Sequence, residues 1–275
     1  MKRFEGILLC TDLDGTLFRK DKSISRENKE AIEYFKEEGG LFTFITGRMP
    51  YYSSKAYNAI EPNAPFGCIN GGGLYDHRSE KYVWTCKPLD SLVFELVDSV
   101  DREVPEAACQ VSTFYKTYFS KYNPAMVRFR ESTGLPNLEL HYKEVREPIA
   151  KIMFSDFNEE NIKKVEQTLK SHPLASNFTL IRSEKTLYEI LPKGIDKGTV
   201  LLKMAEVLGI EQRKTVAVGD YNNDVAMLLA AGAGIAVANA TAEAKAAARY
   251  VTVSNEEHAI ARIISDIESG NIVLQ

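Results

Sequence analysis

The sequence lacks the excess of basic residues that marks most proteins that bind nucleic acid. Of its 275 residues, 34 are Lys or Arg and 38 are Asp or Glu, so the formal net charge is -4. A protein that neutralises phosphates along a nucleic acid usually carries a basic excess or a basic stripe. Here the two signs are interleaved, which argues against a nucleic-acid partner and is compatible with small or acidic ligands.

Long hydrophobic runs are also missing. The longest stretch without a charged or strongly polar residue, 225–238, is shorter than the roughly 20 residues that span a membrane, and Gly232 and Gly234 interrupt it. The apolar run near the start of the chain meets Asp12 almost at once, unlike a signal peptide. We therefore expect no membrane partner and a cytoplasmic location.

Cysteine is scarce, and its spacing is that of neither a metal site nor a disulfide framework. The four cysteines are Cys10, Cys68, Cys86 and Cys109, without a CxxC pair. This pattern predicts buried free thiols in a reducing compartment.

The first part of the chain alternates strand and helix signals. A continuous apolar run at 6–11 suits a strand buried on both faces, and a helix follows from Ser25 to the glycines at 39–40. A strand at 41–46, a helix at 50–60 and a short strand at 66–69 come next. This order predicts parallel strands joined by helical crossovers.

The last part of the chain repeats this pattern, and the middle differs from both. Helix, strand, helix and strand signals at 197–208, 215–219, 220–229 and 235–237 continue the same sheet, with helices on to 267. Between them lie strand candidates at 107–112, 138–142 and 149–155 and two or three amphipathic helices. We predict an α/β protein: a Rossmann-like, doubly wound parallel sheet core (1–84 and 190–275) with an inserted α/β domain (85–189).

The first chemical signal is a pair of carboxylates directly after the first strand. Asp12 and Asp14 in the segment DLDGT are two residues apart, so both face one site if the strand geometry persists. Ligands of open α/β sheets bind beyond the carboxyl ends of the strands. The alternative is an ordinary Asp-Gly turn, which the pair alone does not exclude.

A second acidic pair follows the strand at 215–218. Asp220 and Asp224 in GDYNND are four residues apart, so on the first turn of the helix that follows they share a face, where they either cap the helix or serve a site. Carboxylates from both strand ends would repel one another unless a divalent cation lay among them. Hard oxygen ligands favour Mg²⁺.

Two further segments suit an anionic ligand. Thr46 and Gly47 follow the second strand and offer a hydroxyl and main-chain N–H groups to phosphate oxygens. Lys197 lies where the inserted domain returns to the sheet and is placed to open the next helix. A lone lysine is usually a solvated surface charge, so its neighbourhood decides its role.

In this order the four segments resemble the haloacid dehalogenase superfamily of phosphohydrolases, and the insert resembles the type-2 cap of its Cof-like sugar-phosphatase branch. The family pattern DxDGT, Thr or Ser, Lys, GDxxND is matched over the whole chain. Asn70 and the two glycines after it are similar to a segment of the same branch. The resemblance implies that the insert is a cap that selects the substrate.

The resemblance also implies roles for residues. Asp12 would be the nucleophile that forms an aspartyl-phosphate, and Asp14 the acid and then the base. It further implies which residues bind the metal and which bind phosphate. Mg²⁺ would be held by Asp12, the Asp14 main-chain carbonyl, Asp220 and Asp224, and phosphate by Leu13, Thr46, Gly47, Asn70, Lys197 and Asn223.

These signals predict a magnesium-dependent phosphatase of small phosphorylated metabolites, with sugar phosphates first. The alternatives are a phosphomutase or phosphotransferase on the same scaffold, or a phosphatase of flavin mononucleotide or pyridoxal phosphate. A dinucleotide-binding domain and a P-loop nucleotide kinase or GTPase are disfavoured because neither glycine fingerprint is present. The sequence carries no signal for the oligomeric state.

Overall fold

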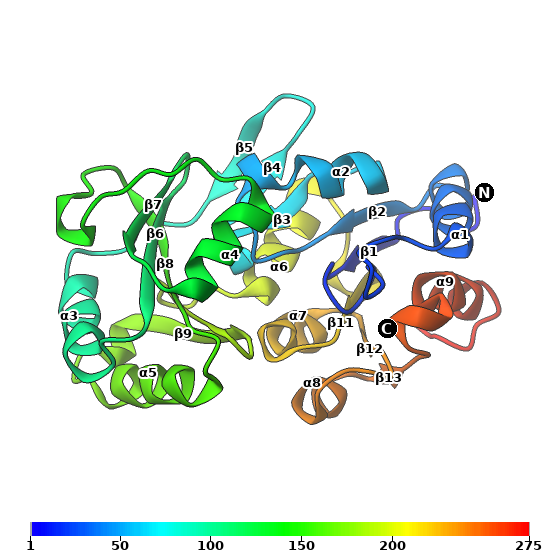
Figure 1. Ribbon diagram of the computed structural model, residues 1–275. Coiled ribbons are helices and arrows are strands. Elements are labelled where there is room, and N and C mark those ends of the chain that lie inside the picture. Colours follow the sequence, from blue (N-terminus) through cyan, green and yellow to red (C-terminus); the bar gives the residue numbers. More distant parts are fainter. Residues whose placement is uncertain (1, 275) are drawn as a thin grey trace. The chain divides into compact units, whose positions relative to one another are not determined.

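A computed structural model describes residues 2–274, which form two compact units (Figure 1). The first unit joins the residues up to Thr85 to those from Asp196 onward, and the second is Cys86–Ile195. The sequence placed the return to the core at 190, whereas the last strand of the second unit continues to Pro192.

The first unit is built on a parallel sheet in the order β13-β12-β11-β1-β2. Thr11, the last residue of β1, pairs with Val218 of β11 and with Phe44 of β2. The strands are β1 Leu8–Thr11, β2 Leu41–Phe44, β11 Thr215–Gly219, β12 Ala233–Ala236 and β13 Tyr250–Val251. The N-terminal and C-terminal parts of the chain thus share one sheet, which confirms the predicted fold class.

Helices cover both faces of this sheet (Figure 1). On one side α1 begins after Ser25, whose hydroxyl accepts from the N–H of Asn28 (3.2 Å), and packs against α9. On the other side α6 and α7 cover Leu8 and Cys10 of β1. The helices are α1 Arg26–Glu37, α2 Ser54–Ile60, α6 Lys197–Leu208, α7 Val225–Ala230, α8 Ala242–Ala247 and α9 Ala259–Glu268. Short 3₁₀ turns lie at Pro50–Tyr52, Ile69–Gly71, Gln212–Lys214, Asn222–Asp224 and Asn255–Glu257.

The strand predicted at 66–69 does not extend the parallel sheet as expected. β3 (Phe66–Cys68) pairs antiparallel with β4 (Gly73–Asp76), which pairs with β5 (Lys81–Thr85). A single bridge between Ile45 and Gly67 connects β3 to the end of β2. A three-residue apolar run specifies burial but not its partner strand, and the tight turn before Gly73 favours a hairpin.

The second unit is an antiparallel sheet in the order β7-β6-β8-β10-β9 with helices α3 and α5 packed on one face. Its strands are β6 Ala108–Thr113, β7 Thr117–Lys121, β8 Ile149–Ser155, β9 Phe178–Glu184 and β10 Leu187–Pro192. Its helices are α3 Val93–Glu103, α4 Pro124–Thr133 and α5 Glu159–Ser171, with 3₁₀ turns at Tyr142–Glu144 and Ala175–Asn177. The expected strands at 107–112 and 149–155 are present. The one at 138–142 is wrong, since that segment makes only an isolated bridge between Glu139 and Phe119.

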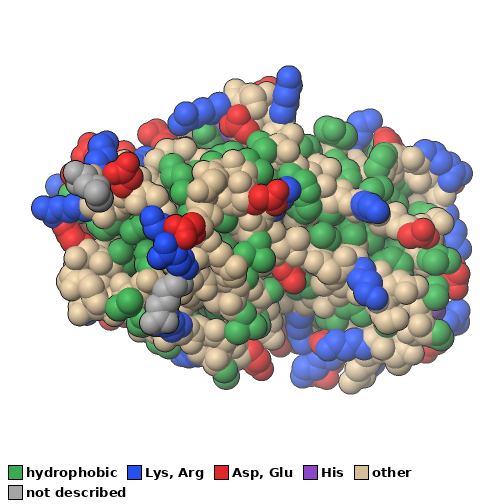
Figure 2. Space-filling model, turned by 180° about the vertical axis from the view of Figure 1, so that it is seen from behind, with side chains coloured by type: hydrophobic (Ala, Val, Ile, Leu, Met, Phe, Trp, Pro, Cys, Tyr) green, Lys and Arg blue, Asp and Glu red, His purple; other side chains and the backbone are tan. Residues whose placement is uncertain are grey.

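Other expectations from composition can be compared with the structure. All four cysteines are free and buried, as predicted. Among residues 2–274, no helix is long and apolar enough to cross a membrane. On the face seen in Figure 2, acidic and basic side chains are interspersed rather than gathered into one stripe.

Candidate active site

The carboxyl ends of neighbouring parallel strands bring the predicted residues together in the first unit. The N–H of Asp12 donates to Val218 O (2.8 Å), so the residue after β1 is still held by β11. On the other side the N–H of Ile45 donates to Thr11 O (2.9 Å), which places Thr46 beside the same edge. The sheet therefore brings together three loops that lie far apart in the sequence, since Asp12 and Asp224 are 212 residues apart.

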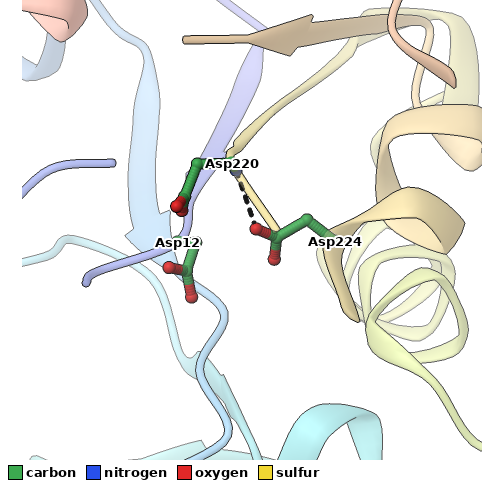
Figure 3. A group of neighbouring side chains, drawn as sticks. All are labelled: Asp12, Asp220 and Asp224. Atoms are coloured by element: carbon green, nitrogen blue, oxygen red, sulfur yellow. Dashed lines mark hydrogen bonds between the residues drawn. The ribbon is translucent and has the colours of Figure 1, made fainter. Parts of the chain in front are cut away.

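Three carboxylates converge at this edge (Figure 3). Asp12, Asp220 and Asp224 each offer one oxygen atom, and these atoms lie within 4.8 Å of one another. Oδ2 of Asp224 accepts from the N–H groups of Asp220 (2.9 Å) and Tyr221 (3.1 Å), which fixes its orientation. Asp224 lies in a 3₁₀ turn that precedes α7 rather than on the first turn of that helix, where the sequence placed it.

Lys197 joins two of these carboxylates. Its Nζ lies 2.5 Å from Oδ1 of Asp12 and 2.5 Å from Oδ1 of Asp224, and the side chain is fully buried. It is the first residue of α6, as predicted, because Asp196 caps the helix by accepting from the N–H of Thr199 (2.9 Å). The surface alternative for this lysine is therefore wrong.

The pKa shifts in this cluster indicate that the single ammonium group of Lys197 does not neutralise the charge of three carboxylates. Burial raises the pKa of Asp12, and the attraction of Lys197 offsets this only in part. Burial and the neighbouring Asp224 raise the pKa of Asp220 to about 6. Burial acts to lower the pKa of Lys197, but Asp12 and Asp224 outweigh it and raise that pKa. A further cation would stabilise the ionised carboxylates, and a set of hard oxygen donors fits Mg²⁺.

The carboxylate of Asp14 lies outside this cluster and has its own partners. Its Oδ1 lies 2.7 Å from Lys22 Nζ and its Oδ2 lies 2.8 Å from Arg48 Nη2. Burial acts to raise the pKa of Asp14, but Arg48 and Lys22 outweigh it and hold the pKa below its ordinary value. Sequence reasoning assigned no role to Lys22 or to Arg48.

The turn after Asp14 connects the two acidic loops. Gly15 has φ +86°, and a Cβ at this position would lie 2.5 Å from Oδ2 of Asp220. The next residue, Thr16, donates its hydroxyl to Oδ1 of Asp220 (2.7 Å), a role that sequence reasoning missed. Leu13 is fully buried, so it has only main-chain groups to offer to a ligand.

The residues predicted to bind phosphate also lie close together. Thr46 O accepts from the N–H of Asn70 (3.1 Å), and a Cβ on Gly47 would lie 2.9 Å from Asn70 Nδ2. Oδ1 of Asn70 accepts from Nδ2 of Asn223 (3.0 Å). Nδ2 of Asn70 is buried and has no hydrogen-bond partner within the described part of the chain. A buried donor without a partner is costly, and an anionic oxygen would satisfy it.

The sequence matches one family of hydrolases over most of its length. The haloacid dehalogenase-like hydrolase family matches residues 9–264, which is nearly the whole chain, so the chain belongs to that family. The predicted resemblance, and with it the prediction of an enzyme, is confirmed.

Individual relatives are similar over their whole length. The 5-amino-6-(5-phospho-D-ribitylamino)uracil phosphatase YwtE of Bacillus subtilis is 28% identical, covering 95% of this chain and 98% of the relative. Phosphatase YwpJ of the same organism is 26% identical, covering 94% of this chain and 99% of the relative. These names support the prediction of a phosphoric monoester hydrolase.

Solved structures agree with this fold. A haloacid dehalogenase-like hydrolase from Bacteroides thetaiotaomicron has a TM-score of 0.80 and 26% identity, covering 95% of this chain and 99% of its own. The subclass IIB sugar phosphatase BT4131 has a TM-score of 0.79 and covers 97% of this chain and 100% of its own. Because its sequence identity is only 22%, this similarity supports the fold alone.

Proposed function

We propose that this protein is a magnesium-dependent phosphatase that hydrolyses small phosphorylated metabolites through an aspartyl-phosphate intermediate. The observation that carries this proposal is the cluster of Asp12, Asp220 and Asp224 around buried Lys197 at the carboxyl end of the sheet. Phosphoryl transfer depends mainly on positioning and on charge neutralisation, and this cluster can supply both.

The two carboxylates of the DLDGT segment would divide the chemistry between them. In the first step an oxygen of Asp12 bonds to phosphorus, the ester P–O bond breaks, and Asp14 gives its proton to the leaving oxygen. In the second step water attacks the phosphorus of the aspartyl-phosphate while Asp14 takes a proton from that water. The bond to Asp12 then breaks, and inorganic phosphate leaves.

The remaining residues of the site would bind and orient the phosphate group of the substrate. Lys197, Thr46, Asn70 and Asn223, with the main-chain N–H groups of Leu13 and Gly47, would hold the phosphate oxygens as their charge shifts. Nδ2 of Asn70, which has no hydrogen-bond partner among residues 2–274, supports this role.

Mg²⁺ would be held by Asp12, the Asp14 carbonyl and Asp220. It would supply charge neutralisation at a phosphoryl oxygen. Both oxygens of Asp224 already accept hydrogen bonds, Oδ1 from Lys197 and Oδ2 from two main-chain N–H groups, which favours a water-mediated contact for Asp224.

The second unit would act as a cap that selects the substrate. Because the relative YwtE is named for a phosphorylated ribitylaminouracil, we propose a sugar or sugar-alcohol phosphate as the substrate class. Fold alone does not determine the substrate, so a substrate panel is needed.

The test is Mg²⁺-dependent phosphate release from a panel of sugar phosphates, flavin mononucleotide and pyridoxal phosphate. We expect release that a chelator abolishes and that Asp12→Asn reduces by about 10³-fold or more, with an unchanged circular dichroism spectrum. Transfer of the phosphoryl group within the sugar without release would indicate a mutase instead. Retained turnover in folded Asp12→Ala would remove the nucleophile assignment.

A further inference from the structure

The segment that follows β12, residues 238–241, contacts both loops that carry the site carboxylates. Nδ2 of Asn239 donates to the carbonyl of Gly15 (2.8 Å), in the turn after Asp14. The N–H of Thr241 donates to the carbonyl of Asp220 (2.9 Å). Residues 238–241 thus connect the DLDGT turn to the GDYNND loop through hydrogen bonds.

The orientation of the Asn239 carboxamide is fixed from its other end. Its Oδ1 accepts from the N–H of Asn255 (3.0 Å). Asn255 is 5% exposed and donates its Nδ2 to the carbonyl of Phe18 (2.8 Å). The carboxamides of Asn239 and Asn255 therefore hold the carbonyls of Gly15 and Phe18, at the two ends of residues 15–18. Because the Asn239 carboxamide supplies a donor and an acceptor at once, it cannot rotate without losing a hydrogen bond.

The peptide that Asn239 holds lies between two groups of the site. Gly15 joins Asp14 to Thr16, whose hydroxyl donates to Asp220. Glycine at positive φ has a wide range of accessible backbone conformations, so this turn needs an external contact to stay in one of them. If this contact were lost, rotation of the Gly15–Thr16 peptide would shift Thr16, and a change in the φ and ψ angles of Gly15 would also redirect the Asp14 carbonyl.

We propose that Asn239 is a positioning residue for hydrolysis. By holding the Gly15 carbonyl it fixes the direction of Asp14 and the contact of Thr16 with Asp220. This inference rests on the proposed function, in which Asp14 is the acid and base and its carbonyl is a ligand of Mg²⁺.

The chain offers a matched control at the far end of β2. Oδ1 of Asn63 accepts from the N–H of Phe42 (2.8 Å), and its Nδ2 donates to the carbonyl of Gly40 (2.9 Å). The Asn63 carboxamide thus donates to one backbone group and accepts from another, as that of Asn239 does, but both partners lie in one segment at the amino end of β2. Asn239→Ala and Asn63→Ala remove equivalent sets of bonds, and since Asn239 is exposed we expect its variant to fold.

The first readout is turnover of an alkyl phosphate by the magnesium-loaded enzyme. We expect Asn239→Ala to lower kcat by about 10-fold with KM changed less than about 2-fold, since small misplacements of catalytic groups carry such costs. Asn63→Ala should keep the wild-type kcat although it loses at least as much thermal stability. Asn239→Asp keeps the acceptor for Asn255 but has no donor for Gly15, so it should be as slow as Asn239→Ala.

A double-mutant cycle shows whether Asn239 acts through Asp14. With p-nitrophenyl phosphate as the substrate, we expect Asn239→Ala to lower kcat less in the Asp14→Asn background than in the wild type. Losses that multiply without coupling, or equal kcat values for Asn239→Ala and Asn63→Ala, would overturn the positioning role.

Calorimetric Mg²⁺ binding separates this inference from the proposed function. We expect Asn239→Ala to weaken Mg²⁺ binding about 3-fold or more relative to Asn63→Ala. If the wild type releases no phosphate, the proposed function fails, and the Mg²⁺ affinities still decide whether Asn239 positions the turn. Equal affinities in the two variants would count against it.

Discussion

Arg48 and Asp14, which are separated by 34 residues in the sequence, form an ion pair with Nη2 2.8 Å from Oδ2. Lys22 occupies the other oxygen of the same carboxylate at 2.7 Å. The carboxyl group that we propose as acid and base is therefore oriented by two cations, whereas Asp12 is oriented by buried Lys197. The two aspartates of one DxD segment thus have different environments, and that of Asp14 favours its ionised form, which is the form that takes a proton from water in the second step.

Arg48→Ala should lower kcat most for the substrates whose hydrolysis depends on protonation of the leaving group. We expect about a 10-fold loss of kcat with alkyl phosphates, because general acid catalysis contributes at least that much. p-Nitrophenyl phosphate, whose leaving group needs little protonation, should lose less. Steady-state kinetics on both substrates measure the difference. Equal losses would indicate that Arg48 binds phosphate rather than orienting Asp14.

Lys22→Ala is the companion variant for that measurement. The Lys22 side chain is 66% exposed, against 31% for Arg48, and exposed ion pairs contribute little. We expect its kcat to stay within about 3-fold of the wild type on both substrates. A loss as large as that of Arg48→Ala would show that both contacts to Asp14 are required.

The metal-free protein should become less stable as the pH rises through the pKa of Asp220. That pKa is about 6, raised by burial first and then by Asp224. A carboxyl with a higher pKa in the folded state stabilises the fold at low pH, and this contribution is lost as the pH rises through the folded pKa. Asp220 should thus lower the free energy of unfolding by about 2–3 kcal/mol between roughly pH 4 and 7.

Urea unfolding in the presence of a chelator measures this effect. Asp220→Asn cannot ionise, so its stability should fall less steeply over the same range of pH. Added Mg²⁺ should raise the stability of the wild type at pH 7, since it binds the folded state. An Asp220→Asn protein with the same pH dependence as the wild type would contradict the assignment.

Lys197→Met should destabilise the metal-free protein by about 3–5 kcal/mol, because it leaves buried Asp12 and Asp224 without their cation. Mg²⁺ should recover part of this loss by neutralising the same carboxylates. We also expect kcat to fall by about 10²-fold or more, since a donor to the phosphate oxygens is lost. Urea unfolding with and without Mg²⁺, together with kinetics, tests both statements.

A buried ion pair in the second unit provides the control for Lys197. Lys151 Nζ lies 2.7 Å from Oε2 of Glu189, and both side chains are nearly inaccessible. Lys151→Met should lose comparable stability, but Mg²⁺ should not recover it. If Mg²⁺ rescued both variants equally, its effect would not be specific to the carboxylates beside Lys197.

The parts of the fold that could be predicted are those that local patterns encode. The continuous apolar run before Asp12 and the cap of Ser25 on the helix that follows it each lie within a few residues. The partner of a strand is not local, so the apolar run at 66–69 predicted a strand but not its antiparallel sheet. The alternating segment 138–142 likewise suggested a strand, although its backbone pairs at one position only.

The residues of the site likewise divide into those that sequence motifs predict and those that only the structure reveals. Asp12, Lys197, Asp220 and Asp224 follow recognisable motifs, and the structure brings all four together. The contacts of Lys22 and Arg48 with Asp14, and of Thr16 with Asp220, depend on how loops fold back across the strand ends. No spacing in the sequence encodes such contacts, so only the three-dimensional arrangement reveals them.

Gly15→Ala should impair the metal site more than it impairs the fold. Alanine at φ +86° is strained by about 1–2 kcal/mol, and its Cβ would lie 2.5 Å from Oδ2 of Asp220, which must then move. We expect Mg²⁺ binding to weaken by about 10-fold, a magnitude seen when the support of metal ligands is lost. Calorimetric titration of the purified variant measures this change.

Gly209→Ala is the control for the effect of backbone strain. Gly209 has φ +66° at the end of α6, and a Cβ there would have no atom within 4 Å. Both variants should therefore lose stability because of the positive φ, but only Gly15→Ala should lose Mg²⁺ affinity and kcat. Equal Mg²⁺ affinities in the two variants would mean that Asp220 can move aside without affecting the metal, and Asp220 would then not be a ligand. A larger loss in Gly15→Ala alone would tie the close approach of the DLDGT turn directly to the function of Asp220.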